Sequence, residues 1–127
     1  MKKNQGQSLI EMVVAIGVVM IIIVALVAVA TISVRNANFS RNQSLATKYA
    51  QEGIEEARRL RDEEGNNFFI DNPSGCNITD TPAEGFSRQR TCSFDGDKTM
   101  TVTVVVSWTD AKGTHKSELT TRLTKWK

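Results

Sequence analysis

The first feature of the hydrophobic pattern is an unbroken apolar run near the amino terminus. Every residue from Met12 to Ala30 is apolar or glycine, and residues 31–34 add only two hydroxyl side chains. At 1.5 Å per residue, a helix of about 20 residues crosses a hydrocarbon layer of about 30 Å. A helix also satisfies its own backbone hydrogen bonds, which an isolated strand in lipid does not. The run therefore predicts a helix long enough to span a membrane.

Beyond this run the pattern becomes amphipathic. Small and apolar residues recur at steps of three and four, which is the period of a helix with one buried face. The stripe consists of Ala46, Ala50, Gly53, Ala57 and Leu60, with Tyr49 and Ile54 beside it. Gly65-Asn66-Asn67 is a typical helix end. We expect one helix from near Ser8 to near Glu64, apolar all round in its first half and one-sided in its second.

The last third of the chain alternates with period two, as strands do. The apolar positions of the first strand are Met100, Val102, Val104, Val106 and Trp108. Residues 110–113 form a turn, and a second strand over about 114–124 places Leu119 and Leu123 on one face. These two strands predict an antiparallel hairpin.

A third strand is predicted over residues 86–94. Its alternation puts Arg88 and Arg90 on the same side as Phe86 and Phe94. Residues 68–82 are dense in turn formers and are predicted to be a loop. A sheet this small needs a cover, and the amphipathic half of the long helix can provide it. The predicted fold class is α+β.

Charge adds an orientation to the apolar segment. Lys2 and Lys3 precede it and Arg35 follows, which favours an amino terminus in the cytoplasm. Glu11 is the only ionisable residue between Lys3 and Arg35. Three interpretations compete. The segment is a plain single-pass anchor, or a secretory signal cut at the A-x-A site ending at Ala30, or a helix that follows a short leader and is kept after cleavage.

The residues around the start of the run carry a resemblance to a known family. The stretch Gly6-Gln7-Ser8-Leu9-Ile10-Glu11 resembles the prepilin cleavage and methylation motif, and the match continues through residues 12–17. Residues 51–62 are similar to a segment of pilus-modification-type minor pilins. The resemblance implies a type IV prepilin-like protein with a pilin-like lollipop fold, in which a long amino-terminal helix packs on a small antiparallel sheet.

The resemblance implies particular site residues. Prepilin peptidase would cut between Gly6 and Gln7 and would methylate the new amino terminus at Gln7, where the family most often has Phe. Glu11 matches the family glutamate and would pair with the Gln7 amine of a neighbouring subunit during assembly. The alternative for Glu11 is an interfacial charge near a helix amino terminus, where the helix dipole favours anions.

Three segments follow from this resemblance. Residues 1–6 form a leader, residues 7–34 the transmembrane or filament-core helix, and residues 35–127 an exported pilin-like domain that includes the amphipathic half of the helix. The expected localisation is a single-pass inner-membrane protein with an exported carboxyl-terminal domain, and later a pilus or pseudopilus. Removing Lys2 and Lys3 with the leader takes the formal charge from +2 to 0, which permits packing in many copies.

The implied function is that of a structural subunit, a minor pilin or pseudopilin of a type IV pilus or a related secretion or DNA-uptake filament. The expected partners are other pilin subunits, prepilin peptidase, the inner-membrane assembly platform and, before assembly, membrane lipid. The alternative function is a secreted soluble binding module released after Ala30. The anchor does not distinguish adhesion, secretion, motility and DNA uptake.

The two cysteines, Cys76 and Cys92, both lie beyond the apolar segment. In an oxidising compartment the simplest interpretation is one disulfide that closes a short loop. Two separate free thiols are the alternative.

The residues indicate no enzyme, cofactor or metal site. His115 is the only histidine, and a solvated side chain beside a turn is the simplest interpretation. No Cys/His cluster has zinc spacing, and Asp95-Gly96-Asp97 is interpreted as a turn instead of a calcium loop. Arg88 and Arg90 near Lys98 suggest a basic patch, but no aromatic side chains are interleaved with it, and nucleic acid is not an expected partner.

Overall fold

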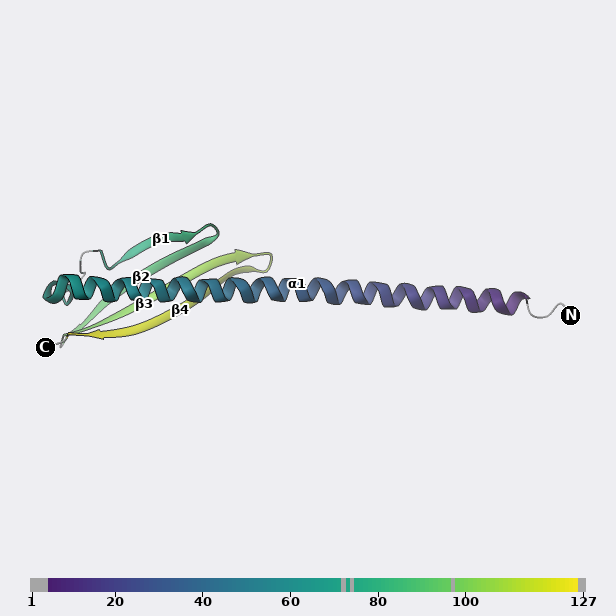
Figure 1. Ribbon diagram of the computed structural model, residues 1–127, viewed down its shortest axis with the longest axis horizontal. Coiled ribbons are helices and arrows are strands. Elements are labelled where there is room, and N and C mark those ends of the chain that lie inside the picture. Colours follow the sequence, from purple (N-terminus) through teal and green to yellow (C-terminus); the bar gives the residue numbers. More distant parts are fainter. Residues whose placement is uncertain (1–4, 72, 74, 97, 126–127) are drawn as a thin grey trace. The chain divides into compact units, whose positions relative to one another are not determined.

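The computed structural model describes residues 5–71, 73, 75–96 and 98–125. Residues 1–4 of the predicted leader lie outside this part of the chain, as do residues 72, 74 and 97 of the predicted turns. The chain divides into two compact units, Met1–Phe39 and Ser40–Lys127. The elements in order are α1 (Gln5–Glu64), a 3-10 turn η1 (Gly65–Phe68), β1 (Ile78–Ala83), β2 (Phe86–Gly96), β3 (Thr99–Asp110) and β4 (Gly113–Thr124) (Figure 1).

Helix α1 agrees with the helix predicted from the hydrophobic pattern. In its second half the predicted stripe is buried, with Ala46, Ala50 and Ala57 all inaccessible to solvent. The helix ends at Glu64, and Gly65 follows with a φ of +55°, a left-handed conformation that glycine adopts without a steric penalty. The expected α+β arrangement, a long amino-terminal helix packed on a small antiparallel sheet, is confirmed.

The four strands form one antiparallel sheet in the order β1-β2-β3-β4. Trp108 on β3 lies opposite Phe86 on β2 and opposite His115 on β4. The β3–β4 pairing runs from Thr99↔Thr124 to Asp110↔Gly113 without a shift in register. The predicted hairpin and the predicted third strand are therefore confirmed. Both arginines of β2 face the core, as the alternation required.

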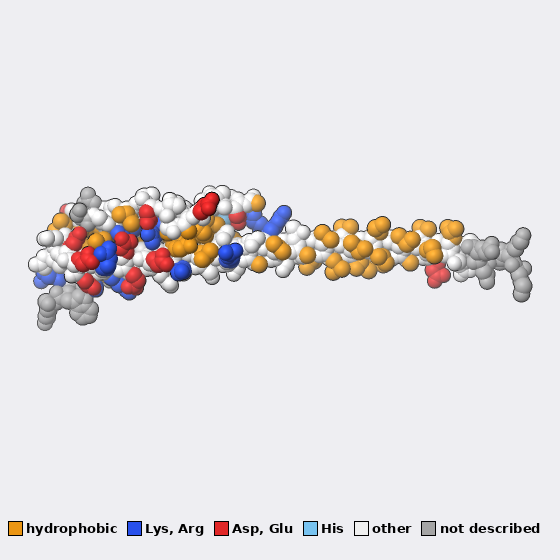
Figure 2. Space-filling model, turned by 45° about the horizontal axis from the view of Figure 1, so that its top comes forward, with side chains coloured by type: hydrophobic (Ala, Val, Ile, Leu, Met, Phe, Trp, Pro, Cys, Tyr) orange, Lys and Arg blue, Asp and Glu red, His pale blue; other side chains and the backbone are white. Residues whose placement is uncertain are grey.

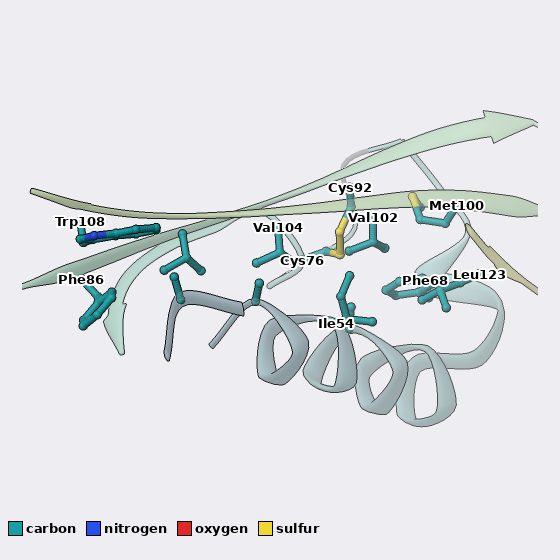
Figure 3. Close-up of a cluster of buried hydrophobic side chains, with 14 residues drawn as sticks. Ile54, Phe68, Cys76, Phe86, Cys92, Met100, Val102, Val104, Trp108 and Leu123 are labelled. Atoms are coloured by element: carbon teal, nitrogen blue, oxygen red, sulfur yellow. A yellow bond between two sulfur atoms is a disulfide. The ribbon is translucent and has the colours of Figure 1, made fainter. Parts of the chain in front are cut away.

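The core of the second unit lies between one face of the sheet and residues 46–57 of α1 (Figure 3). Phe68, Met100 and Leu123 lie at one end of this core and Phe86 and Trp108 at the other. Gly53 allows the helix to approach the sheet closely, since a Cβ atom there would lie 2.9 Å from Val104 Cγ1. The apolar residues that alternate along the strands and those that recur every three to four residues along the helix thus pack together in one apolar layer.

Two sequence-based expectations were wrong. Residues 68–82 are not a continuous loop, because β1 begins at Ile78 and pairs with β2. The strand was hidden by Pro82 and by the register shift between Asp80 and Ala83. His115 is not simply solvated. Its ring packs 5.5 Å from that of Trp108, and its Nε2 atom lies 3.0 Å from Asp110 Oδ1.

Candidate functional site

The first unit contains the amino-terminal part of α1, whose surface is apolar on all sides from Met12 to Ala30. Every Leu, Ile, Val and Met side chain from Leu9 to Val34 is between 51% and 71% exposed. Figure 2 shows these side chains along the first half of α1. A helix that is hydrophobic all round belongs in a membrane or in a protein core. This surface therefore needs an apolar environment that the chain itself does not supply.

By length and composition, α1 is the one helix in the described part of the chain that can cross a membrane. Its most apolar 18-residue window has a mean hydropathy of 3.3, and none of that window is buried. Thr31, near the end of the run, donates its hydroxyl hydrogen to the carbonyl oxygen of Val27 at 2.9 Å. This bond hides the hydroxyl from an apolar environment.

The motif residues lie at the beginning of this helix. Gly6, Gln7 and Glu11 all belong to α1 and are exposed. Gly6 has nothing within 4 Å of the position that a Cβ atom would take. Gln7 and Glu11 are four residues apart, so their side chains share one face of the helix. The Glu11 carboxylate and the Gln7 side chain thus lie together near the start of an apolar surface.

The position of Glu11 bears on its alternative interpretation. Helix α1 begins at Gln5 and has no acidic residue in its first turn. Glu11 lies one turn farther along, and the helix dipole acts mainly within the first turn. The dipole therefore offers Glu11 little stabilisation.

In the second unit, two arginines of β2 are buried against α1, β1 and the loop before β1. Arg90 is 1% exposed, and its guanidinium reaches three carbonyl oxygens, those of Cys76 at 2.8 Å, Gly75 at 2.9 Å and Gly53 at 3.2 Å. Glu56 on α1 lies 3.4 Å away and supplies the opposite charge. A buried guanidinium is tolerated because it is paired and its hydrogens are bonded.

Arg88, two residues earlier, makes a second link of the same kind. It forms a bidentate pair with Asp80 of β1 and donates to the carbonyl oxygen of Tyr49 on α1 at 3.2 Å. The hydrogen bond from Arg88 holds the pKa of Asp80 below its usual value, and the same bond raises the pKa of Arg88. Burial lowers the pKa of Arg90, against the opposing effect of Glu56.

These contacts settle the interpretation of Arg88 and Arg90. They do not form a basic surface patch, because their guanidinium groups are turned into the domain and paired with carboxylates. The sequence pattern did indicate that these arginines are buried. Two arginines on the apolar side of a predicted strand require buried acceptors, but the acceptors come from α1, β1 and the loop before β1, which local periodicity does not connect to β2.

The disulfide expected from the sequence is present. Cys76 and Cys92 are bonded, with their Cα atoms 6.0 Å apart. Cys76, just before β1, is fully buried, and Cys92 on β2 is 7% exposed. The disulfide lies in the second unit, whereas Gly6, Gln7 and Glu11 lie in the first. Among the residues that the structure describes, no three His, Cys, Asp or Glu side chains are grouped as a metal site would need.

An exposed apolar helix with a carboxylate near its start, followed by a small α+β domain, defines a membrane-anchored class of protein. The comparison with known families adds one finding. Residues 1–30 match the family described as the prokaryotic N-terminal methylation motif. The amino-terminal 30 residues of the chain are therefore prepilin-like. Searches of curated proteins and of solved structures find no match.

Proposed function

We propose that this chain is a minor pilin or pseudopilin, a structural subunit of a type IV pilus or of a related secretion or DNA-uptake filament. Prepilin peptidase would cut between Gly6 and Gln7, and the methylated or free amine of Gln7 would begin the mature chain. The 7–34 segment would first be held in the inner membrane and then enter the filament core, while residues 35–127 would form the exported domain.

The observation that supports this proposal is the exposed apolar surface of residues 7–34, on which Glu11 is the single ionisable side chain. In a filament core the apolar side chains of neighbouring helices would cover one another. Glu11 of one subunit would pair with the Gln7 amine of the next. Because an unpaired buried charge is strongly destabilising, this pair would fix the register of each added subunit.

The decisive experiment is the intact mass and amino-terminal sequence of the protein recovered from its native membrane or sheared filament fraction. We expect a chain that begins at Gln7, with or without one added methyl group. A chain that begins at Thr31 would establish the secreted module instead. A chain that begins at Met1 would leave a plain anchor.

Two variants sharpen this experiment. Gly6→Leu places a bulky side chain at the proposed cut, and the space around Gly6 means that the change does not disturb packing. We expect it to leave the chain uncut. Ala30→Leu alters the A-x-A site in the same way and is expected to leave the start at Gln7. If Ala30→Leu left the chain uncut and Gly6→Leu did not affect cleavage, the results would favour an ordinary signal peptide.

A further inference from the structure

The loop that carries Cys76 is held in place by contacts other than the disulfide. Cys76 donates its backbone N–H to the carbonyl oxygen of Pro73 at 3.2 Å, and its own carbonyl oxygen accepts from Arg90 Nε at 2.8 Å. The adjacent Gly75 accepts from the same guanidinium at 2.9 Å and adopts a φ of +74°. Both backbone groups of Cys76 are therefore occupied independently of its sulfur.

The other cysteine is held in a similar manner. The backbone N–H of Cys92 donates to Asn77 Oδ1 at 2.7 Å, so the residue after Cys76 is tied to the strand that carries Cys92. Arg90 and Cys92 are two residues apart on β2 and face the same side of the sheet. Figure 3 shows the disulfide near the middle of the core, beside Val102 and on the side of the sheet that faces Ile54.

Arg90 also connects this loop to the long helix. Its guanidinium contacts Gly53 O at 3.2 Å and Glu56 Oε2 at 3.4 Å, both on α1. A planar guanidinium presents several donors in a fixed arrangement, which a lysine ammonium cannot reproduce. Helix, loop and strand are thereby fixed around one buried side chain.

We propose that Arg90 and Asn77 form a clamp that places the Cys76 and Cys92 thiols within bonding distance before they are oxidised. We call these two residues the loop clamp. The disulfide would then lock a loop that the loop clamp has already positioned. This inference is independent of the proposed filament role, because it concerns the second unit alone.

The chemistry is ordinary thiol–disulfide exchange with a small disulfide such as oxidised glutathione. One protein thiolate attacks a glutathione sulfur, forms a mixed disulfide and releases one glutathione thiolate. The second protein thiolate then attacks the protein sulfur of the mixed disulfide and releases the other glutathione. Two protein thiols are oxidised and one oxidised glutathione becomes two reduced ones.

The loop clamp should appear as a high effective concentration of one thiol at the other. The cysteines are 16 residues apart, and a flexible linker of that order gives an effective concentration in the millimolar range. A loop positioned by hydrogen bonds gives a higher value, because the chain has already lost the entropy that closing a flexible loop would cost. The equilibrium constant for oxidation by glutathione measures this effective concentration directly.

The test uses the full-length chain in detergent micelles, equilibrated in buffers of reduced and oxidised glutathione, with thiols trapped and counted by mass. Arg90→Lys retains the charge and loses the fork of donors, and Asn77→Ala removes the acceptor for Cys92. We expect each to lower the oxidation constant about tenfold, which corresponds to a shift of about 30 mV. Arg88→Lys is the matched control, because the bonds of Arg88 go to Asp80 and Tyr49, and it should change the constant less than twofold.

Circular dichroism of each reduced variant shows whether the domain stays folded. Oxidation constants for Arg90→Lys and Asn77→Ala that equal the wild-type value would overturn the proposal. So would an Arg88→Lys variant that lowers the constant as far as Arg90→Lys does, because the effect would then be general destabilisation. If reduced Arg90→Lys does not fold, the test rests on Asn77→Ala, because Asn77 is exposed. An unchanged oxidation constant for Asn77→Ala then rejects the loop clamp.

Discussion

Three charged residues show two ways in which this chain handles an ionised group next to apolar surface. Arg88 and Arg90 are buried, and both find carboxylates and carbonyl oxygens within the second unit. Glu11 stands at the start of an apolar helix, exposed in the isolated chain. Its surroundings in an assembly would come from other subunits, which is why it is the residue on which assembly should depend.

We predict that Glu11→Ala leaves the protein cleaved and membrane-bound but poorly assembled. The unpaired amine of a neighbouring Gln7 would then be buried, at a cost of about 3–5 kcal/mol for breaking such a pair. Comparison of membrane and sheared filament fractions measures the effect. Glu55→Ala, in the second half of the same helix, is the control and should assemble normally. Wild-type amounts of assembled Glu11→Ala subunit would contradict the prediction.

Acid stability should depend on Asp80. Its pKa is lowered in the folded state by Arg88, so it contributes stability above its unfolded pKa of about 3.9, and this contribution is lost as the pH falls through the folded value. Asp80→Asn should therefore lower the denaturation midpoint at pH 6 and weaken its decline toward pH 2. Asp71→Asn, an exposed control, should leave the curve as in wild type. Parallel curves for Asp80→Asn and wild type would show that the pair contributes nothing.

At the scale of elements, α1 combines two helices of different character in one run of 60 residues. The first half is apolar on every side, and the second half buries a narrow stripe of small residues. Alanine and glycine at the contact allow close approach to β3, whose valines fill the space. The second half of the helix is thus shaped for its own sheet, and the first half is shaped for surfaces outside the chain.

Gly53 is the point at which this packing is tightest. Gly53→Ala would gain about 1 kcal/mol of helix propensity, but its Cβ would lie 2.9 Å from Val104 Cγ1 and 3.3 Å from Arg88 Cδ. Overpacking costs about 1–3 kcal/mol, so we expect a net loss of about 1 kcal/mol in denaturant unfolding. Ser44→Ala, at an exposed position of the same helix, should change stability by less than about 0.5 kcal/mol. If Gly53→Ala were more stable than wild type, the side chains of the sheet would have to shift at little cost to accommodate the added Cβ atom.

The elements that the sequence predicted are those with a regular period. The helix, the β3–β4 hairpin and β2 all follow from the spacing of apolar residues. Strand β1 was missed because it is short, contains Pro82 and shifts register between Asp80 and Ala83. The partners of Arg88 and Arg90 could not be foreseen either, because they depend on contacts between segments as far apart as Gly53 and Arg90, which only the folded chain brings together.

At the scale of the whole molecule, the division into two units separates two tasks. The core of the second unit begins at Ala46 and is complete within that unit, where it is closed by one disulfide. Every described residue of this core belongs to the second unit. Folding of the second unit should therefore be independent of the apolar segment that precedes it.

We accordingly predict that a fragment of residues 35–127, produced behind an ordinary cleavable signal, is a soluble, oxidised and cooperatively folded domain. Its unfolding in urea should be a single transition, and reduction should lower its stability by about 3 kcal/mol, as expected for a loop of this length. Reduction should not abolish the transition, because the helix–sheet core and the arginine links remain. A matched fragment that begins at residue 51 removes Ala46 and Ala50 from the core and should lose cooperative unfolding. If the 35–127 fragment itself aggregated or unfolded gradually, the amino-terminal helix would have to be a structural part of the domain, and the separation of anchor from domain would fail.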